Sequence, residues 1–209
     1  MGRARSGDER LRSIVEPGCA DRSGTGTAVT KSRAGGGVRC DSDRMTVLVA
    51  YATHSGATRT LAETITETLT AAGVPAELVD VDQSPDPTGY DAVVLGSGVR
   101  IDAAEKPATA WAKSHREVLS SKPMAFFTCS GSAADPAKGG KQKAADSFVE
   151  MLGFSPVAVK NFPGWVIMDK IPVHERLLLK SMRTPTGDFR DLDAVRAWAQ
   201  EIAPLLQKG

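Results

Sequence analysis

Residues Thr46 to Thr58 read TVLVAYATHSGAT and give the strongest indication of the fold. The first six of them, Thr46 to Tyr51, are almost wholly apolar, as expected of a strand that is buried on both faces of a parallel sheet. Apolar residues then recur at helical spacing from Thr58 to Ala72, and Gly73 ends that pattern. A buried strand, a polar loop with a glycine, and an amphipathic helix together predict the first half of a βαβ unit.

The same alternation of strand and helix continues to the C-terminus. Further strands are predicted over Pro75–Val81, Asp91–Gly96, Pro123–Cys129 and Pro156–Phe162, and further helices over Lys106–Ser120, Lys141–Leu152 and Leu192–Leu206. Strands that alternate with helices imply right-handed crossovers and a parallel sheet with helices on both faces. Five strands at this spacing predict an α/β fold with the doubly wound order 2-1-3-4-5.

Residues 1–44 differ from the rest of the chain. They are rich in Gly, Ser, Arg and Thr and show almost no apolar periodicity. Such a segment cannot bury enough apolar surface to offset the entropy of ordering it. We therefore expect a disordered tail over 1–44, or a start assigned upstream of the true one at Met45, and a single domain over 45–209.

Charge and cysteine content exclude several classes of protein. The tail holds nine basic against six acidic residues, and residues 45–209 hold 17 basic against 19 acidic. Neither part shows the basic stripe of a nucleic-acid-binding protein. The three cysteines form no CxxC pair, so no metal site is expected, and a reduced cytoplasmic setting fits best. No run of about 18 apolar residues is present that could cross a membrane.

The loop Thr53–Thr58 has the composition of a phosphate-binding loop. In an open α/β sheet a ligand lies beyond the carboxyl ends of the strands, at the switch point beside the first strand. Three hydroxyl side chains, a glycine and the N-terminus of a helix meet there and favour a dianionic phosphate. No Lys or Arg lies within these six residues, so hydrogen-bond donors would hold the phosphate. The alternative is that a hydroxyl merely caps the helix.

Two further loops are expected at the same edge of the sheet. One is Ser97–Ile101 after the third strand, and the other is Thr128–Ser132 after the fourth. Gly98 and Gly131 would let backbone groups approach the polar edge of a ligand ring, whereas the alternative is a pair of plain β–α turns. The Gly-x-Gly-x-x-Gly pattern of an NAD site is missing after the first strand.

The pattern Thr-x-Ser-Gly-x-Thr resembles the FMN phosphate loop of the flavodoxins. Within that superfamily the chain is most similar to the menaquinone-dependent protoporphyrinogen IX dehydrogenase group. The similarity covers about Met45–Leu206. It lies in Val94–Arg100, Pro123–Thr128, Arg176–Met182, Thr186-Gly187-Asp188 and the helix around Trp198.

The resemblance implies a flavodoxin-like domain with FMN as its cofactor, with deazaflavin left open. The implied cofactor-binding residues are Thr53, His54, Ser55, Gly56, Ala57, Thr58, Ser97, Gly98, Val99, Arg100, Cys129, Ser130 and Gly131. Arg100 could place positive charge near the N1/O2 edge of the flavin, or could lie in solvent beside Asp102. Cys129 is expected to be a small buried residue rather than a redox thiol. No catalytic residue is identified.

The loops also bear on the class of function. Neither contains an aromatic side chain of the kind that electron-carrying flavodoxins place against the flavin, and residues 45–209 are close to neutral. An uncovered flavin face would accept a flat substrate, which favours an enzyme over an electron carrier. The resemblance implies a two-electron oxidoreductase with a quinone as acceptor and a porphyrinogen-like or other flat molecule as donor. The alternatives are a one-electron carrier flavodoxin and a non-catalytic flavin-binding module.

The segment between Pro163 and Asp188 is too long for an ordinary connection in such a fold. Ile171–Met182 mixes leucines with Lys and Arg. It could be a helix that covers the sheet edge, or an interfacial helix that meets a hydrophobic substrate or the membrane surface weakly. We expect a cytoplasmic protein that is either free or peripheral to the inner membrane face. Trp165–Arg183 is expected to govern substrate access and not to hold the fold together.

Overall fold

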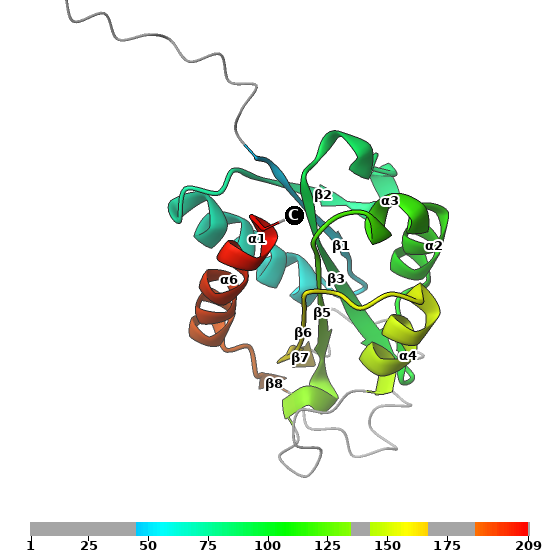
Figure 1. The fold of residues 1–209 in the computed structure, drawn as a ribbon. Helices are drawn as coiled ribbons and strands as arrows, with labels where there is room; N and C mark the ends of the chain where they lie inside the picture. Colours follow the sequence, from blue (N-terminus) through cyan, green and yellow to red (C-terminus); the bar gives the residue numbers. More distant parts are fainter. Residues whose placement is uncertain (1–44, 135–142, 167–186, 209) are drawn as a thin grey trace, which may run out of the picture. The chain divides into compact units, whose positions relative to one another are not determined.

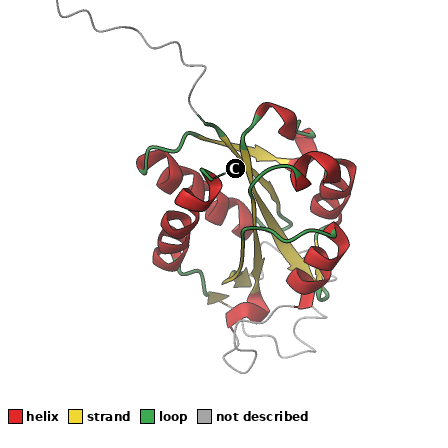
Figure 2. Cartoon of the chain, in the orientation of Figure 1, coloured by secondary structure: helices red, strands yellow, loops and turns green. Residues whose placement is uncertain are grey.

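The computed structural model describes residues 45–134, 143–166 and 187–208 of the 209-residue chain. The predicted tail over 1–44 and the predicted insert segment Ile171–Met182 lie outside these residues. Within the described residues the fold is a parallel sheet between two layers of helices (Figures 1 and 2).

Five parallel strands form the central sheet. They are β1 (Val47–Ala52), β2 (Ala76–Asp80), β3 (Ala92–Arg100), β5 (Met124–Ser130) and β6 (Ala158–Pro163). Their order is β2-β1-β3-β5-β6, and the short β4 (Ala103–Ala104) pairs antiparallel with β3. Counting only the parallel strands, this is the order 2-1-3-4-5, so the predicted doubly wound α/β fold is confirmed.

The third strand is longer than predicted. The sequence prediction ended it at Gly96, but Gly96 lies in the middle of β3. A Cβ on Gly96 would lie 2.2 Å from a ring atom of Phe127, so glycine is needed there for close packing and does not mark a turn. Pairing with β5 continues from Gly96 through Gly98, and the chain turns only at Ile101 and Asp102, which have φ of 50° and 55°.

The helices lie where the apolar periodicity placed them, with one correction. They are α1 (Ala57–Ala71), α2 (Lys106–Ser114), α3 (Arg116–Ser120), α4 (Lys143–Leu152) and α6 (Leu192–Leu206). The single helix predicted over Lys106–Ser120 is wrong, because the chain leaves helical geometry at His115, with φ −109° and ψ 14°. The hydroxyl of Ser114 and the N–H of His115 both donate to the carbonyl of Trp111 at this break.

Short elements complete the described chain. Single 3-10 turns cover Val81–Gln83, Pro87–Gly89 and Gly131–Ala134. Two more short strands, β7 (Trp165–Val166) and β8 (Gly187–Asp188), pair antiparallel as a separate ribbon. No helix of the described part of the chain is long and apolar enough to cross a membrane.

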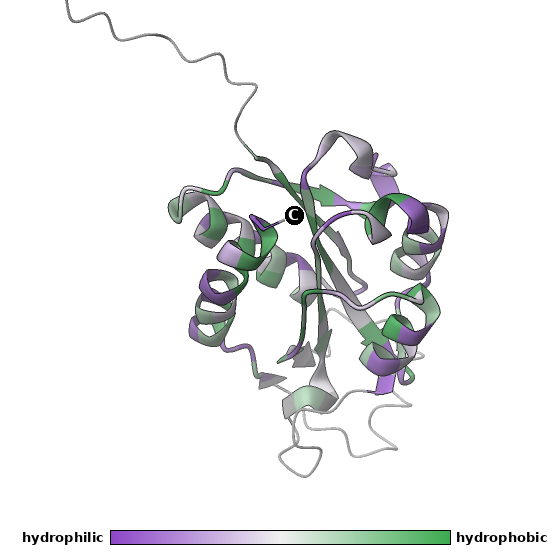
Figure 3. Cartoon of the chain, in the orientation of Figure 1, coloured by the Kyte–Doolittle hydropathy of each residue, from purple (hydrophilic) through white to green (hydrophobic). Residues whose placement is uncertain are grey.

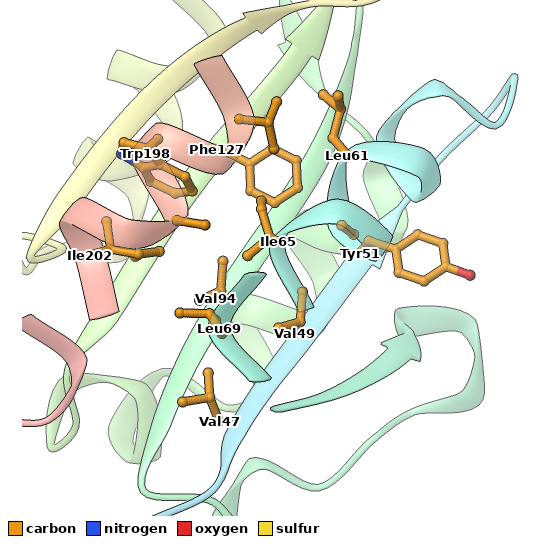
Figure 4. Close-up of a cluster of buried hydrophobic side chains, with 14 of the residues drawn as sticks. Val47, Val49, Tyr51, Leu61, Ile65, Leu69, Val94, Phe127, Trp198 and Ile202 are labelled. Atoms are coloured by element: carbon orange, nitrogen blue, oxygen red, sulfur yellow. The ribbon is translucent and has the colours of Figure 1, made fainter. Parts of the chain in front are cut away.

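The sheet has a hydrophobic core on each face. Alternate residues of β1 point to opposite sides: Val47, Val49 and Tyr51 to one cluster, and Leu48, Ala50 and Ala52 to the other. Helices α1 and α6 cover the first face, and α2, α3 and α4 cover the second (Figure 1). Figure 4 shows the first cluster, in which Ile65 and Leu69 of α1 and Trp198 and Ile202 of α6 meet the strands.

The helices are amphipathic in the way this layering requires. Apolar residues are concentrated in the strands, and the helices alternate between apolar and polar positions (Figure 3). Each buried Leu or Ile contributes roughly 1.5–3 kcal/mol to folding. With both faces of the sheet covered in this way, the carboxyl ends of β1, β3 and β5 lie side by side at one edge, where the predicted loops follow.

Candidate phosphate and cofactor site

The loop after β1 turns sharply into α1. The hydroxyl oxygen of Thr53 accepts a hydrogen bond from the backbone N–H of Gly56, with a distance of 3.0 Å. Gly56 itself has φ +91°, in the left-handed region that glycine tolerates best. The turn therefore uses one of the three predicted hydroxyls to shape the loop and uses the glycine to let the chain enter the helix.

The N-terminus of α1 is left without a side-chain cap. Gly56 is the N-cap residue, it makes no side-chain cap bond, and the first turn of α1 contains no acidic residue. No Thr or Ser of the loop occupies the N-cap position, and the loop hydroxyl of Thr53 accepts from the N–H of Gly56. The positive end of the helix dipole is thus presented at the loop, which favours a bound anion.

Thr58 joins the three strand ends. Its side chain is 2 % exposed, and its hydroxyl oxygen lies 3.4 Å from where a Cβ on Gly98 would be. Its hydroxyl also bonds to the thiol of Cys129 at the end of β5, which is 5 % exposed. Burial raises the pKa of the Cys129 thiol to about 12, although the Thr58 bond acts in the opposite direction. Thr58 therefore ties the loop to β3 and β5, and Cys129 is a neutral, buried thiol.

The predicted residues after β3 separate into buried and exposed groups. Ser97 is fully buried, where its hydroxyl donates to the carbonyl of Gly98 at 2.8 Å and accepts from the N–H of Glu105 at 2.9 Å. Gly98 is also buried, Val99 is half-buried, and Arg100 is exposed. The backbone of this segment is strand rather than loop, so its polar edge is held in a fixed position.

The remaining predicted residues lie close to the same edge. Ser130 is buried, and its hydroxyl oxygen accepts from the N–H of Ala133 at 3.0 Å, which starts the turn at Gly131. Ala57 is buried beneath the loop, whereas His54 is exposed on it. The structure thus brings the three predicted segments together, with Thr58, Gly98 and Cys129 in contact at the centre.

Two residues that the sequence prediction did not assign to the site lie against the loop. The indole N–H of Trp165 in β7 is 3.2 Å from both the carbonyl and the hydroxyl oxygens of Ser55. The guanidinium of Arg190, which follows β8, lies 4.0 Å from the centre of the Trp165 ring. Pro163-Gly164 signals a turn before Trp165, but nothing in the local sequence places Arg190 here.

Backbone contacts anchor this ribbon to the site. The N–H of Gly164 donates to the carbonyl of Ser130 at 2.9 Å, and the N–H of Phe189 donates to the carbonyl of Gly164 at 3.2 Å. A Cβ on Gly164 would lie 2.8 Å from the Cys129 sulfur, so a side chain there would push the ribbon away. The start and end of the long segment after β6 therefore pack against the loops after β1 and β5.

Taken together, these features fit a ligand that carries a phosphate. The loop offers an uncapped helix N-terminus, a left-handed glycine and polar side chains, and a side chain at Gly56 would come within 3.4 Å of the Trp165 ring. The ends of β3 and β5 lie next to it, where a planar group attached to the phosphate would reach them.

Comparison with known proteins identifies a family model and several relatives. The model described as a flavodoxin domain matches residues 48–193. Protoporphyrinogen IX dehydrogenase (quinone) of Escherichia coli K12 is 25% identical over 177 residues, which cover 78% of this chain and 98% of that protein. The enzyme of the same name from Leishmania major is 26% identical over 172 residues, covering 76% of this chain and 74% of that protein.

Solved structures share the fold. Flavodoxin 1 from Bacillus cereus superposes with a TM-score of 0.53 at 16% identity, covering 76% of this chain and 97% of that one. A flavodoxin from the domain Archaea gives a TM-score of 0.51 at 14% identity, covering 78% of this chain and 99% of that one. At these identities the two structures establish the arrangement of strands and helices.

Proposed function

The chain belongs to the flavodoxin domain family, so its cofactor is FMN, and we propose that it is an FMN-dependent oxidoreductase that moves two electrons from a flat donor to a quinone-type acceptor. The observation that carries this proposal is the uncapped N-terminus of α1 beside the segments Ser97–Glu105 and Thr128–Ala134, which bear no aromatic side chain.

The residues of the loop after β1 would hold the phosphate. Backbone N–H groups at the start of α1 and the hydroxyl of Ser55 are the donors that this loop offers, and Thr53 keeps it in shape. The backbone of β3 from Gly98 to Arg100 and that of Ser130 and Gly131 would then flank the ring. When bound, FMN supplies a group that accepts and returns an electron pair.

The flavin face is where an enzyme and an electron carrier differ. The segments from Ser97 to Glu105 and from Thr128 to Ala134 contain no Phe, Tyr or Trp that could stack on the ring. A ring left uncovered by these segments has room for a second flat molecule. This supports turnover of a planar substrate over the transfer of single electrons to a protein partner.

The relatives named above suggest the substrates. Both are protoporphyrinogen IX dehydrogenases that use a quinone, and the bacterial one aligns along 98% of its length. We propose a porphyrinogen-like donor and a quinone acceptor for this chain. Each turnover would remove two electrons and two protons from the donor and release the acceptor as a quinol. Peripheral contact with a quinone-containing membrane is part of the same proposal.

The first test is a reductive titration of the FMN-loaded protein without oxygen. The proposal predicts that the visible spectrum passes from the oxidised to the fully reduced form in a single two-electron step. A separate one-electron spectrum at half reduction would instead support a carrier flavodoxin.

The second test is turnover. FMN in the protein should bleach on mixing with protoporphyrinogen and recover its colour on adding a menaquinone analogue, in solution or in vesicles. Heat-denatured protein with free FMN at the same concentration is the control. Binding of FMN without reduction by any donor would identify a non-catalytic flavin-binding module and refute the enzyme.

A further inference from the structure

Arg190 brings a positive charge to a loop that has none of its own. The six residues Thr53–Thr58 include no Lys or Arg. Arg59, the next residue, is 61 % exposed at its side chain and pairs with Glu63 on its own helix at 2.8 Å. Arg190 comes from near the C-terminal end of the chain, and its guanidinium lies over the indole of Trp165, whose N–H bonds to Ser55.

Arg190 is held rigidly in this place. Its Nε and Nη2 donate to the two carboxylate oxygens of Asp188 at 2.8 and 2.5 Å, in the two-pronged geometry that suits guanidinium and carboxylate. Its flat face lies on the Trp165 ring, 4.0 Å from the centre. Its Nη1 group carries two further N–H donors, which make no hydrogen bond to the described residues. The side chain of Arg190 is 17 % exposed against 45 % for Asp188, so water screens the cation less than the carboxylate.

Trp165 connects this cation to the loop. Its indole N–H points at both the carbonyl and the hydroxyl oxygens of Ser55, so the lone pairs of that hydroxyl face the indole and its proton is directed elsewhere. The ring also lies against Gly56, where a Cβ would come within 3.4 Å. Trp165 therefore holds both residues at the centre of the loop.

We propose that Trp165 and Arg190 make the site selective for the phosphorylated flavin. Trp165 is a positioning residue that keeps Ser55 turned as a donor to the phosphate, and Arg190 is the countercharge that the loop lacks. A phosphate monoester carries a charge of about −1.5 to −2 at neutral pH, whereas riboflavin has an uncharged hydroxyl at the same place. The pair thus acts on FMN and leaves riboflavin unaffected. This inference rests on the proposed function.

The test compares the affinities for FMN and riboflavin, measured by fluorescence quenching of each flavin on titration with full-length apoprotein. Arg190→Gln should weaken FMN binding by about tenfold, because one countercharge is lost, and should change riboflavin binding by less than about twofold. Arg190→Lys restores the charge without the flat stack and should recover part of the loss. Trp165→Phe keeps the ring but not the N–H, and should weaken FMN binding severalfold.

Arg196→Gln is the matched control, because it removes the same charge from an exposed arginine of α6 that pairs with Asp193 at 2.7 Å. It should leave both affinities within about twofold of wild type. Raising the salt concentration should weaken FMN binding to the wild type more than to Arg190→Gln. Thermal melting of each apoprotein checks that it is folded. If Arg190→Gln is unfolded at the assay temperature, the ratio of FMN to riboflavin affinity in Arg190→Lys and Trp165→Phe tests the inference instead.

An equal loss of FMN and riboflavin in Arg190→Gln would assign Arg190 a structural role and overturn the inference. An unchanged ratio in all three variants would do the same. In both cases the wild type still binds FMN, so the proposed function stands. A wild type that binds neither flavin overturns the proposed function and the inference with it, and this outcome is recognised before any variant is made.

Discussion

Each end of the sheet holds a cationic side chain, and the two cations have different partners. At the amino end, the ammonium of Lys122 donates to the carbonyl oxygens of Pro87 at 2.7 Å and Thr88 at 3.1 Å, and also to that of Tyr90. At the carboxyl end, Arg190 is held by a carboxylate and an aromatic ring beside a loop rich in N–H donors. The amino-end cation satisfies acceptors, whereas the carboxyl-end cation adds to a surplus of donors.

Glycines at the two ends show the same contrast. Gly73 closes α1 at the amino end with φ +81°, and a Cβ there would meet nothing within 4 Å. Gly56 opens α1 at the carboxyl end with φ +91° and lies against Trp165. Gly73 therefore ends the helix in open surroundings, whereas Gly56 lets the loop enter the helix while packed against Trp165, beside an N-terminus without a side-chain cap. The predictions below test whether the two ends differ in this way, and they begin with the strongest effect.

The thiol of Cys129 should be almost unreactive, although it lies at the ligand end. Its pKa is raised to about 12 by burial, so its thiolate fraction at neutral pH is on the order of a thousandfold below that of an ordinary cysteine. In a full-length Cys19→Ser, Cys40→Ser protein, iodoacetamide should label Cys129 about a thousandfold faster in urea than in buffer. Rapid labelling of the native protein would show that the carboxyl end holds a functional thiol.

Gly56→Asp should abolish the yellow colour, with FMN affinity reduced about a hundredfold or more. The new carboxylate adds a like charge beside the phosphate and a side chain at a left-handed position. Absorbance of the protein after reconstitution with FMN and gel filtration measures the effect.

Gly73→Asp is the matched control for Gly56→Asp, since it adds the same charge and a comparable strain of about 1–2 kcal/mol at the other end of the same helix. It should lower the melting temperature and leave FMN affinity unchanged. Equal loss of FMN in both variants would mean that the stability of α1, and not the loop, limits binding.

Lys122→Met should lower the free energy of unfolding by about 2 kcal/mol, because three backbone carbonyls lose a charged donor. Urea unfolding measures the lost free energy of unfolding, and the dependence of that free energy on urea concentration should stay unchanged. Lys113 is an exposed lysine of α2, so the control Lys113→Met should change the free energy of unfolding by less than about 0.5 kcal/mol. FMN affinity of the folded variant should equal that of the wild type. A specific loss of FMN would contradict a purely structural role for the amino end.

Tyr90, also at the amino end, should lose its proton only at high pH and should contribute little to the free energy of unfolding. Its hydroxyl donates to Glu77 at 2.6 Å, and this bond raises the pKa of Tyr90 to about 12. The bond needs the protonated phenol, so its contribution is complete below pH 10 and is lost as the pH rises through about 12. Since Glu77 is exposed, we expect Tyr90→Phe to cost only about 0.5 kcal/mol. The tyrosinate absorbance of wild type and Tyr90→Phe, measured against pH, checks this raised pKa. If the difference between the two absorbance curves has its midpoint near pH 10, the raised pKa is refuted.

Local patterns in the sequence are sufficient for most of the elements. Leu192–Leu206 has the predicted bounds, and α1 differs from its prediction by one residue at each end. The predicted boundaries were wrong at Gly96, which lies inside a strand, and at His115, where one predicted helix is two. Gly96 was taken as the end of a strand because its packing partner, Phe127, lies 31 residues away and cannot be seen locally.

The sequence alone determined the sheet order, the loop after β1 and the family, since a buried strand followed by a polar glycine loop and an amphipathic helix is encoded in neighbouring residues. Which other residues contact that loop depends on how the chain packs in three dimensions. The Trp165–Ser55 contact spans 110 positions of the chain, and Arg190 reaches it through the pairing of β7 with β8. Contacts of this kind depend on how distant strands pack, so no local pattern of hydrophobicity or charge records them.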